Sequence, residues 1–172
     1  METDNRFRFR AWVPVFYDDE DGCEHETMMC IDNVVVYSDG AIGCSENDLD
    51  SAVINLELSE SEEQSVRDYI EANFSTESDL WYFFDISTAI KEQCAGLSDK
   101  IGNLIYEGDI VRGAENTVGT VKFGKHGYDS INVGFYIQWD MKHPWRYDIG
   151  YWTAPENPDC IEIIGNIHEH KE

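Results

Sequence analysis

Several features that would assign a class of protein are missing from this chain. No apolar run approaches the roughly 18 residues that a membrane helix needs, and the first six residues hold no apolar segment of a secretory signal. The Gly-rich phosphate loop, the G-x-S-x-G motif and the H-E-x-x-H motif are also absent. We therefore expect a cytoplasmic protein with no membrane partner and no enzymatic activity; a small enzyme of unknown type stays the alternative.

Paired cysteines are missing as well. The five cysteines are an odd number and none forms a C-x-x-C pair. Cys23, His25, Cys30 and Cys44 do not have the spacing of a regular zinc site, and the acids from Asp18 to Gly22 lack the order of a calcium loop. We expect reduced thiols, no metal and no cofactor.

Lys and Arg are missing from a third of the chain. Between Ala11 and Val66 there are fifteen acidic residues and no Lys or Arg, and the whole chain has a formal charge of −23. Such a field repels nucleic acid and anionic membranes and attracts basic partners.

The acidic half suggests one function. A run of carboxylates without cations resembles a row of phosphates, so it can occupy the basic, nucleic-acid-binding surface of another protein as a DNA mimic. The alternative is that the acidity only keeps the protein soluble. The residues that we predict to bind the partner are Asp18, Asp19, Glu20, Asp21, Glu24, Glu26, Glu46, Asp48 and Asp50.

The first half shows one clear helix among short strands. Residues 6–13 alternate as a half-buried strand does, and Asp18 to Gly22 is typical of a solvated turn. Two more strands are predicted at 27–31 and 34–37, with a turn at 32–33, then loop at 46–50 and a strand at 53–58. Ser59 and Glu62 have the spacing of a capping box, and an apolar stripe follows them, which predicts a helix. Residues 80–86 are densely aromatic and predict either a strand or the start of a short helix.

The second half predicts strands almost throughout. Residues 99–103 indicate a turn, 104–106 a short strand, 107–109 a second turn and 110–111 the start of another strand. Alternation at 120–123 and 131–140, apolar residues at 147–151 and the segment 161–167 predict the remaining strands. We expect a mainly β (α+β) fold: a small curled antiparallel sheet or an SH3-like barrel, with one amphipathic helix and an acidic insertion.

Three segments carry a resemblance to a known family. The central string is Leu97-x-Asp99-Lys100-x-Gly102-x-x-Ile105-Tyr106-Glu107-Gly108-Asp109-Ile110-Val111. It resembles the signature of the YopX-like proteins of phages and prophages; residues 7–12 are similar to the family's opening strand and 161–169 to its closing one. Residues from about 18 to 92 match no pattern. The resemblance implies origin in a mobile element and a mainly β fold. On such an element, occupation of a basic surface on a host protein would give an anti-defence or regulatory role in the host-cell cytoplasm.

The resemblance and the charge pattern together suggest two parts. Residues 1–95 form an acidic part with the opening strand and the helix. Residues 96–172 form a barrel-like core, which we expect to make one compact domain together with the strand at 6–13.

A basic segment offers a second hypothesis. Residues 121–147 are locally positive and aromatic, as in sites where bases stack. The candidate nucleic-acid-binding residues are Lys122, Lys125, Lys142, Trp145 and Arg146. The charge of the whole chain opposes a polyanion, so the same patch can instead dock the acidic half in a homo-oligomer that has no ligand.

Overall fold

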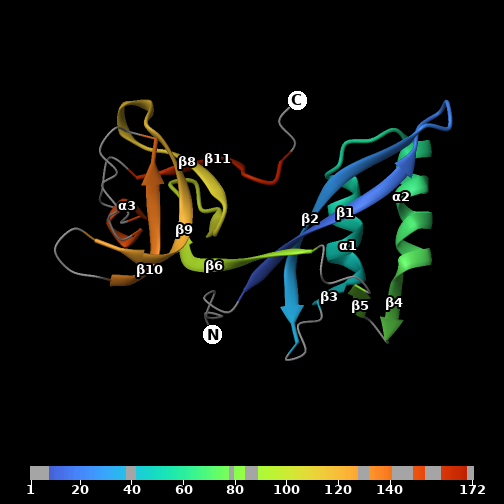
Figure 1. Cartoon of the computed structure of the whole chain (residues 1–172), viewed down its shortest axis with the longest axis horizontal. Helices are drawn as coiled ribbons and strands as arrows, with labels where there is room; N and C mark the ends of the chain where they lie inside the picture. The colour runs from blue at the N-terminus through green and yellow to red at the C-terminus, as the bar shows by residue number, and fades with distance from the viewer. Residues whose placement is uncertain are drawn as a thin grey trace. The chain divides into compact units, whose positions relative to one another are not determined.

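A computed structural model describes residues 8–37, 42–77, 80–83, 89–127, 132–140, 149–153 and 160–169. Two compact units divide the chain: residues 8–91 form the N-terminal unit and residues 92–169 the C-terminal unit. Each unit has its own core, and we describe each by itself (Figure 1). The expectation that residues 96–172 make one compact domain together with the strand at 6–13 stays a prediction.

The N-terminal unit is an antiparallel sheet with two helices against it (Figure 1). Its strands lie in the order β4-β5-β3-β2-β1. The elements are β1 (Phe9–Asp18), β2 (Glu24–Val36), β3 (Ile42–Ser45), α1 (Glu46–Ile54), α2 (Glu60–Asn73), β4 (Phe74–Glu77) and β5 (Leu80–Phe83).

The core of this unit lies between sheet and helices. Val13 and Val15 from β1 and Met29 and Ile31 from β2 are buried against apolar residues of both helices. The alternation predicted for the first strand places these β1 side chains inward, because successive residues of a strand point to opposite faces.

Strand β2 is longer than the sequence indicated. Two strands with a turn at residues 32–33 were expected, but one strand runs through both. The register with β1 shifts between Phe9 and Ala11, and Asn33 on β2 has φ of 56°. Because Asn tolerates the left-handed region, the extra residue forms a bulge instead of reversing the chain.

Helix α1 corrects a second expectation, since residues 46–50 were predicted as loop and 53–58 as a strand. Ser45 caps the helix by accepting a hydrogen bond from the backbone N–H of Asp48. Leu49, Ala52 and Val53 are buried at i, i+3 and i+4, which is helical spacing. The cap and the apolar stripe therefore outweigh the strand-like alternation that follows.

Helix α2 confirms the predicted capping box. The carboxylate of Glu62 accepts hydrogen bonds from the Ser59 backbone N–H at 2.8 Å and from the Ser59 hydroxyl at 2.6 Å. Val66 and Ile70 face the core. The helix ends at Phe74, where strand β4 begins.

The C-terminal unit combines a hairpin with a four-stranded antiparallel sheet (Figure 1). Strands β6 (Ile90–Ser98) and β7 (Leu104–Tyr106) form the hairpin. The sheet has the order β10-β9-β8-β11. Its elements are β8 (Asp109–Arg112), a 3-10 turn (Ala114–Asn116), β9 (Val118–His126), β10 (Asn132–Trp139) and β11 (Glu162–Asn166), with the short helix α3 (Gly150–Thr153) before β11.

Its core is built from the centres of these strands. Val111, Val121 and Ile137 are buried from β8, β9 and β10, with Ile105 and Ile161 beside them. A mainly β fold with a small curled antiparallel sheet is thus confirmed. The described strands do not close into a barrel, because β10 and β11 are the two edges of their sheet.

Two further expectations, one in each unit, need comment. A strand was predicted at 147–151, of which residues 149–151 are described. Ile149 is buried and residues 150–153 form helix α3, so the described part is not a strand. The aromatic run at 80–86 begins as strand β5, and residues 84–86 lie outside the described residues.

The cap of α1 can be tested by mutation. Ser45→Ala removes the acceptor for an orphan N–H, so we expect the free energy of unfolding to fall by about 1 kcal/mol. Ser51→Ala is the control, because its hydroxyl only bonds back to the Asn47 carbonyl within the same helix. Urea unfolding followed by circular dichroism measures both, and equal losses would contradict the role of Ser45 as a cap.

Candidate functional site

Asp19 organises the turn between β1 and β2. One of its carboxylate oxygens accepts hydrogen bonds from the backbone N–H groups of Asp21 (3.0 Å) and Cys23 (2.9 Å). The other oxygen lies 2.8 Å from Nε2 of His25. The sequence prediction of a turn at Asp18 to Gly22 is confirmed, and the geometry shows that a carboxylate holds it.

These contacts also set the acidity of Asp19. The hydrogen bond from His25 is the largest cause that lowers its pKa, and the N–H of Cys23 adds to it, because each favours the charged form. Asp19 therefore stays ionised and keeps the turn closed at neutral pH.

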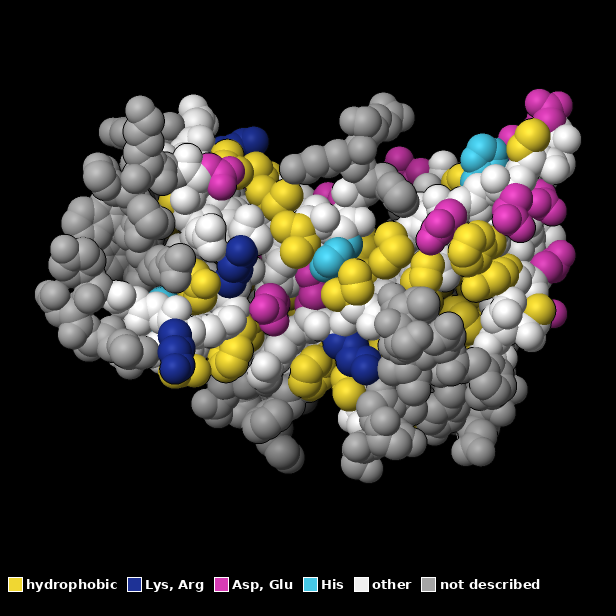
Figure 2. Space-filling view, viewed as in Figure 1, with side chains coloured by type: hydrophobic (Ala, Val, Ile, Leu, Met, Phe, Trp, Pro, Cys, Tyr) yellow, Lys and Arg dark blue, Asp and Glu magenta, His cyan; other side chains and the backbone are white. Residues whose placement is uncertain are grey.

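The turn displays six carboxylates, which we call the hairpin acidic surface: Asp18, Asp19, Glu20, Asp21, Glu24 and Glu26. Figure 2 shows acidic side chains gathered around the end of the β1–β2 hairpin. Over the described ranges, no ion pair involves Glu20, Asp21, Glu24 or Glu26. The imidazole of His25 is the one basic side chain between Ala11 and Val66.

Helix α2 extends this surface. The hydroxyl of Ser65 accepts a hydrogen bond from the backbone N–H of Asp18 at 2.8 Å, which fixes the hairpin against the helix. The first turn of α2 contributes Glu60, Glu62 and Glu63. Negative charge at a helix N-terminus interacts favourably with the helix dipole, so these acids are stabilised at the position where they add to the acidic surface.

The other three predicted partner-binding residues lie elsewhere. Glu46, Asp48 and Asp50 belong to α1, and Asp48 accepts hydrogen bonds from Ser45 and from Asn33, at 3.1 Å. Asn33 is nine residues along β2 from Glu24, a separation of about 30 Å. Asp50 forms an ion pair with Arg67. The nine predicted residues therefore form two groups, at the hairpin and at α1.

The basic segment is only partly described. Lys122 and Lys125 both lie on β9, three residues apart, so they point to opposite faces of the strand. Lys142, Trp145 and Arg146 lie outside the described residues. The structure thus shows no row of cations on this strand.

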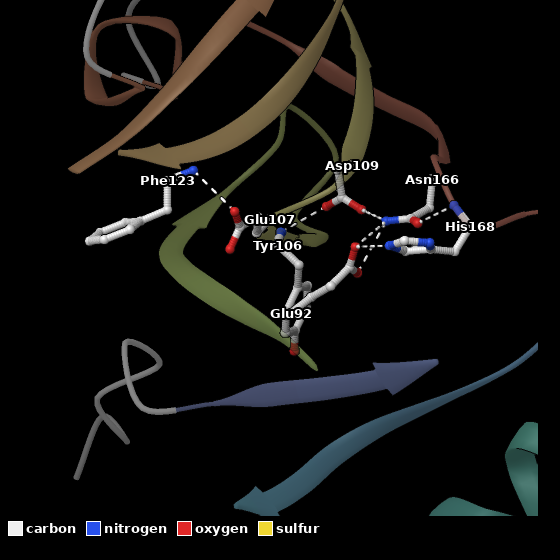
Figure 3. A network of polar contacts seen from close by, with 7 residues as sticks. All are labelled: Glu92, Tyr106, Glu107, Asp109, Phe123, Asn166 and His168. Atoms are coloured by element: carbon white, nitrogen blue, oxygen red, sulfur yellow. Dashed lines mark hydrogen bonds and ion pairs between the residues drawn. The ribbon is translucent and has the colours of Figure 1, made fainter. Parts of the chain in front are cut away.

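A buried polar network fastens the strands of the C-terminal unit (Figure 3). Asn166 at the end of β11 donates through Nδ2 to both oxygens of Glu92 at 3.1 Å and to Asp109 at 3.4 Å. Asp109 also accepts the Tyr106 N–H at 2.7 Å. Glu92, Asp109 and Asn166 are 2%, 0% and 3% exposed, so their donors and acceptors must be satisfied inside the protein.

His168 completes this network. Its backbone N–H donates to Oδ1 of Asn166 at 2.8 Å, and its Nε2 lies 3.5 Å from Oε1 of Glu92. The side chain of His168 is 21% exposed, and His170 lies outside the described residues. Two carboxylates, an amide and an imidazole thus converge where β6, β8 and β11 meet.

Asp99 forms a second fastening point for β11. Its Oδ1 accepts the N–H groups of Ile101 and Asn103, which closes the predicted turn. Its Oδ2 accepts the N–H of Ile163 at 3.2 Å. Lys100 pairs with Glu162 at 2.7 Å and lowers the pKa of that carboxyl. The acidic residues of the central string therefore hold backbone groups in place.

Sequence reasoning found part of this network. The turns at 99–103 and 107–109 are the predicted ones, but the roles of Glu92 and Asn166 were not predicted. Asn166 lies 74 residues from Glu92 and 57 from Asp109, so no local pattern joins them. The sequence feature that could have indicated this network is Gly108, between Glu107 and Asp109, because its backbone lies close to the carboxylate of Glu92.

Comparison with known protein families identifies one that matches this chain. The family model described as YopX protein matches residues 44–172, which is 129 of the 172 residues. The chain belongs to the YopX family. The match includes the central string at 97–111 and the closing strand, and it also covers residues 44–92, for which no pattern was recognised. Residues 7–12, which resembled an opening strand, lie outside it.

A search among curated proteins found no match. None of the helices within the described ranges has the length and apolar character needed to cross a membrane.

The cysteines and possible metal ligands can also be placed. Cys44 is buried, which raises the pKa of its thiol to about 12, and Cys23 is exposed. In the part of the chain that the structure describes, no three His, Cys, Asp or Glu side chains are grouped as metal ligands.

Gly108 offers a sharp test of the network. Its φ is +86°, and an added Cβ would come within 1.9 Å of Oε1 of Glu92. Gly108→Ala combines backbone strain with this clash, so we expect the free energy of unfolding to fall by about 3 kcal/mol or more. Gly102→Ala is the matched control, because Gly102 has φ of +97° and open space around it; about 1–2 kcal/mol is expected from strain alone. If chemical unfolding shows the same loss of unfolding free energy for both variants, the close approach to Glu92 does not contribute to the effect of Gly108→Ala.

The turn predicts a pH dependence. Because the folded-state pKa of Asp19 lies below its ordinary value, its carboxylate stabilises the turn above about pH 4, and this contribution is lost as the pH falls through the folded pKa. Carboxyl-carbon NMR titration should give Asp19 a midpoint below that ordinary value. In His25→Ala the midpoint should rise, and an unchanged midpoint would show that His25 does not hold the carboxylate.

Proposed function

We propose that this YopX-family protein is a phage or prophage accessory protein that acts in the host cytoplasm by binding a protein, without enzymatic activity. Its hairpin acidic surface binds a basic surface of a host protein and competes there with nucleic acid. An anti-defence role follows from such competition.

The observation that carries the proposal is the register of the hairpin. Asp18 on β1 is directly opposite Glu24 on β2. Like charges directly opposite each other destabilise a strand pair. Glu26 lies two residues from Glu24, so both point to the same face of β2. An arrangement that costs stability supports a functional use of the charge over mere solubility, because isolated acids elsewhere on the surface would serve solubility equally well.

Charge complementarity gives the mechanism. An exposed carboxylate set with one neighbouring imidazole attracts Lys and Arg side chains over about a Debye length, roughly 10 Å at 0.1 M salt. It speeds encounter with a basic groove and repels anionic competitors. The partner is therefore defined by its chemistry, as a protein surface that otherwise binds phosphates.

The test uses two variants of the full chain with the same change in charge. The first neutralises four hairpin acids: Glu20→Gln, Asp21→Asn, Glu24→Gln and Glu26→Gln. Asp19 is kept, since it holds the turn. The control variant neutralises four other exposed acids: Glu57→Gln, Asp68→Asn, Asp140→Asn and Glu169→Gln.

Capture from host lysate, with the eluate read by mass spectrometry, should give basic proteins that bind the unmodified chain and the control. The hairpin variant should bind them about tenfold more weakly and with a smaller salt dependence. Glu24→Gln alone should raise the urea midpoint, because it removes the repulsion from Asp18. Equal binding by both four-residue variants would refute the proposal.

A further inference from the structure

Helices α1 and α2 border a small, partly open cavity whose chemistry is mixed. Its volume is about 120 Å³, and it is lined by Glu46, Leu49, Asp50, Val53, Arg67, Ile70 and Glu71. Drug-sized ligands occupy roughly 300–1,000 Å³, so this cavity suits a single side chain. We call it the α1–α2 pocket.

The pocket is made by one stripe from each helix. Glu46, Leu49, Asp50 and Val53 follow helical spacing on α1, so they share a face. Arg67, Ile70 and Glu71 do the same on α2. The apolar members, Leu49, Val53 and Ile70, are buried and form the floor.

The rim is acidic. Glu46 and Glu71 are exposed, and Asp50 is half exposed. Arg67 is the single cation, and its guanidinium is engaged by Asp50. Among the described residues no ion pair involves Glu46 or Glu71. Three carboxylates against one guanidinium leave the pocket with a formal charge of −2.

We propose that the α1–α2 pocket receives a lysine side chain from a basic segment of the partner. The four-carbon stem of lysine is apolar and its head is charged, which matches an apolar floor beneath an acidic rim. An ammonium has three donors that can reach separate carboxylates, whereas a guanidinium needs a planar fork. This inference rests on the proposed function and adds an anchoring site apart from the hairpin acidic surface.

The probe is a capped hexalysine peptide, titrated onto the full chain at about 0.01 M salt, where screening is weak. Glu46→Gln with Glu71→Gln should weaken binding about tenfold. Glu20→Gln with Glu24→Gln removes the same charge at the hairpin and should weaken it less than threefold. All four residues are exposed, so both variants keep the core.

A second peptide tests the floor. Its side chains are diaminobutyric acid, which carries the same charge on a stem two methylenes shorter. It should bind the unmodified chain about tenfold more weakly than hexalysine, because buried methylenes are lost. The Glu46→Gln, Glu71→Gln variant should discriminate the two peptides less. The backbone amides of Leu49, Val53 and Ile70 should shift on NMR titration with hexalysine.

The outcomes separate the two proposals. If hexalysine binds but both charge variants weaken it equally and the shorter peptide binds as well, the pocket is refuted and the proposed function stands. If hexalysine does not bind the unmodified chain, both are refuted. Glu71→Gln alone, which leaves the first turn of α1 unchanged, should still weaken binding about threefold; no effect would overturn the pocket.

Discussion

An excess of carboxylates over cations constrains this whole structure. The chain has 35 acidic residues and 12 Lys or Arg, so most carboxylates cannot find a cation. Those at structural positions are held by N–H donors instead. Asp19 binds two backbone N–H groups, Asp99 binds three, and Asp109 binds one together with the amide of Asn166. Hydrogen bonds to a charged acceptor are stronger than neutral ones, so they suit this use.

The same constraint separates the acids that hold the fold together from those that face solvent. Carboxylates whose oxygens accept N–H groups, as in Asp19 and Asp99, fix turns. Carboxylates that lack such donors, as in Glu20 and Glu24, project into solvent. A charge count alone does not make this distinction, because both kinds occur side by side in the same turn.

The sequence predicted those elements whose signals are local. The capping box at Ser59 and Glu62 and the turns at 99–103 and 107–109 involve residues within a few positions of each other. Helix α1 was missed because Ser45 caps a segment whose later residues alternate like a strand. The bulge at Asn33 was missed because it depends on the register with β1. The link from Glu92 to Asn166 depends on tertiary packing that no window of sequence contains.

The position of Asn166 in the chain has a consequence for synthesis on the ribosome. Among the residues whose burial the structure describes, the core of the N-terminal unit lies before residue 75, apart from Ala89 at its margin. The carboxylates of Glu92 and Asp109, in contrast, accept hydrogen bonds from Asn166, which is synthesised 74 and 57 residues after them. Until then two neighbouring carboxylates that end up buried stay hydrated, and the sheet that they join lacks its last strand. The nascent chain therefore displays its acidic hairpin before its second unit can close.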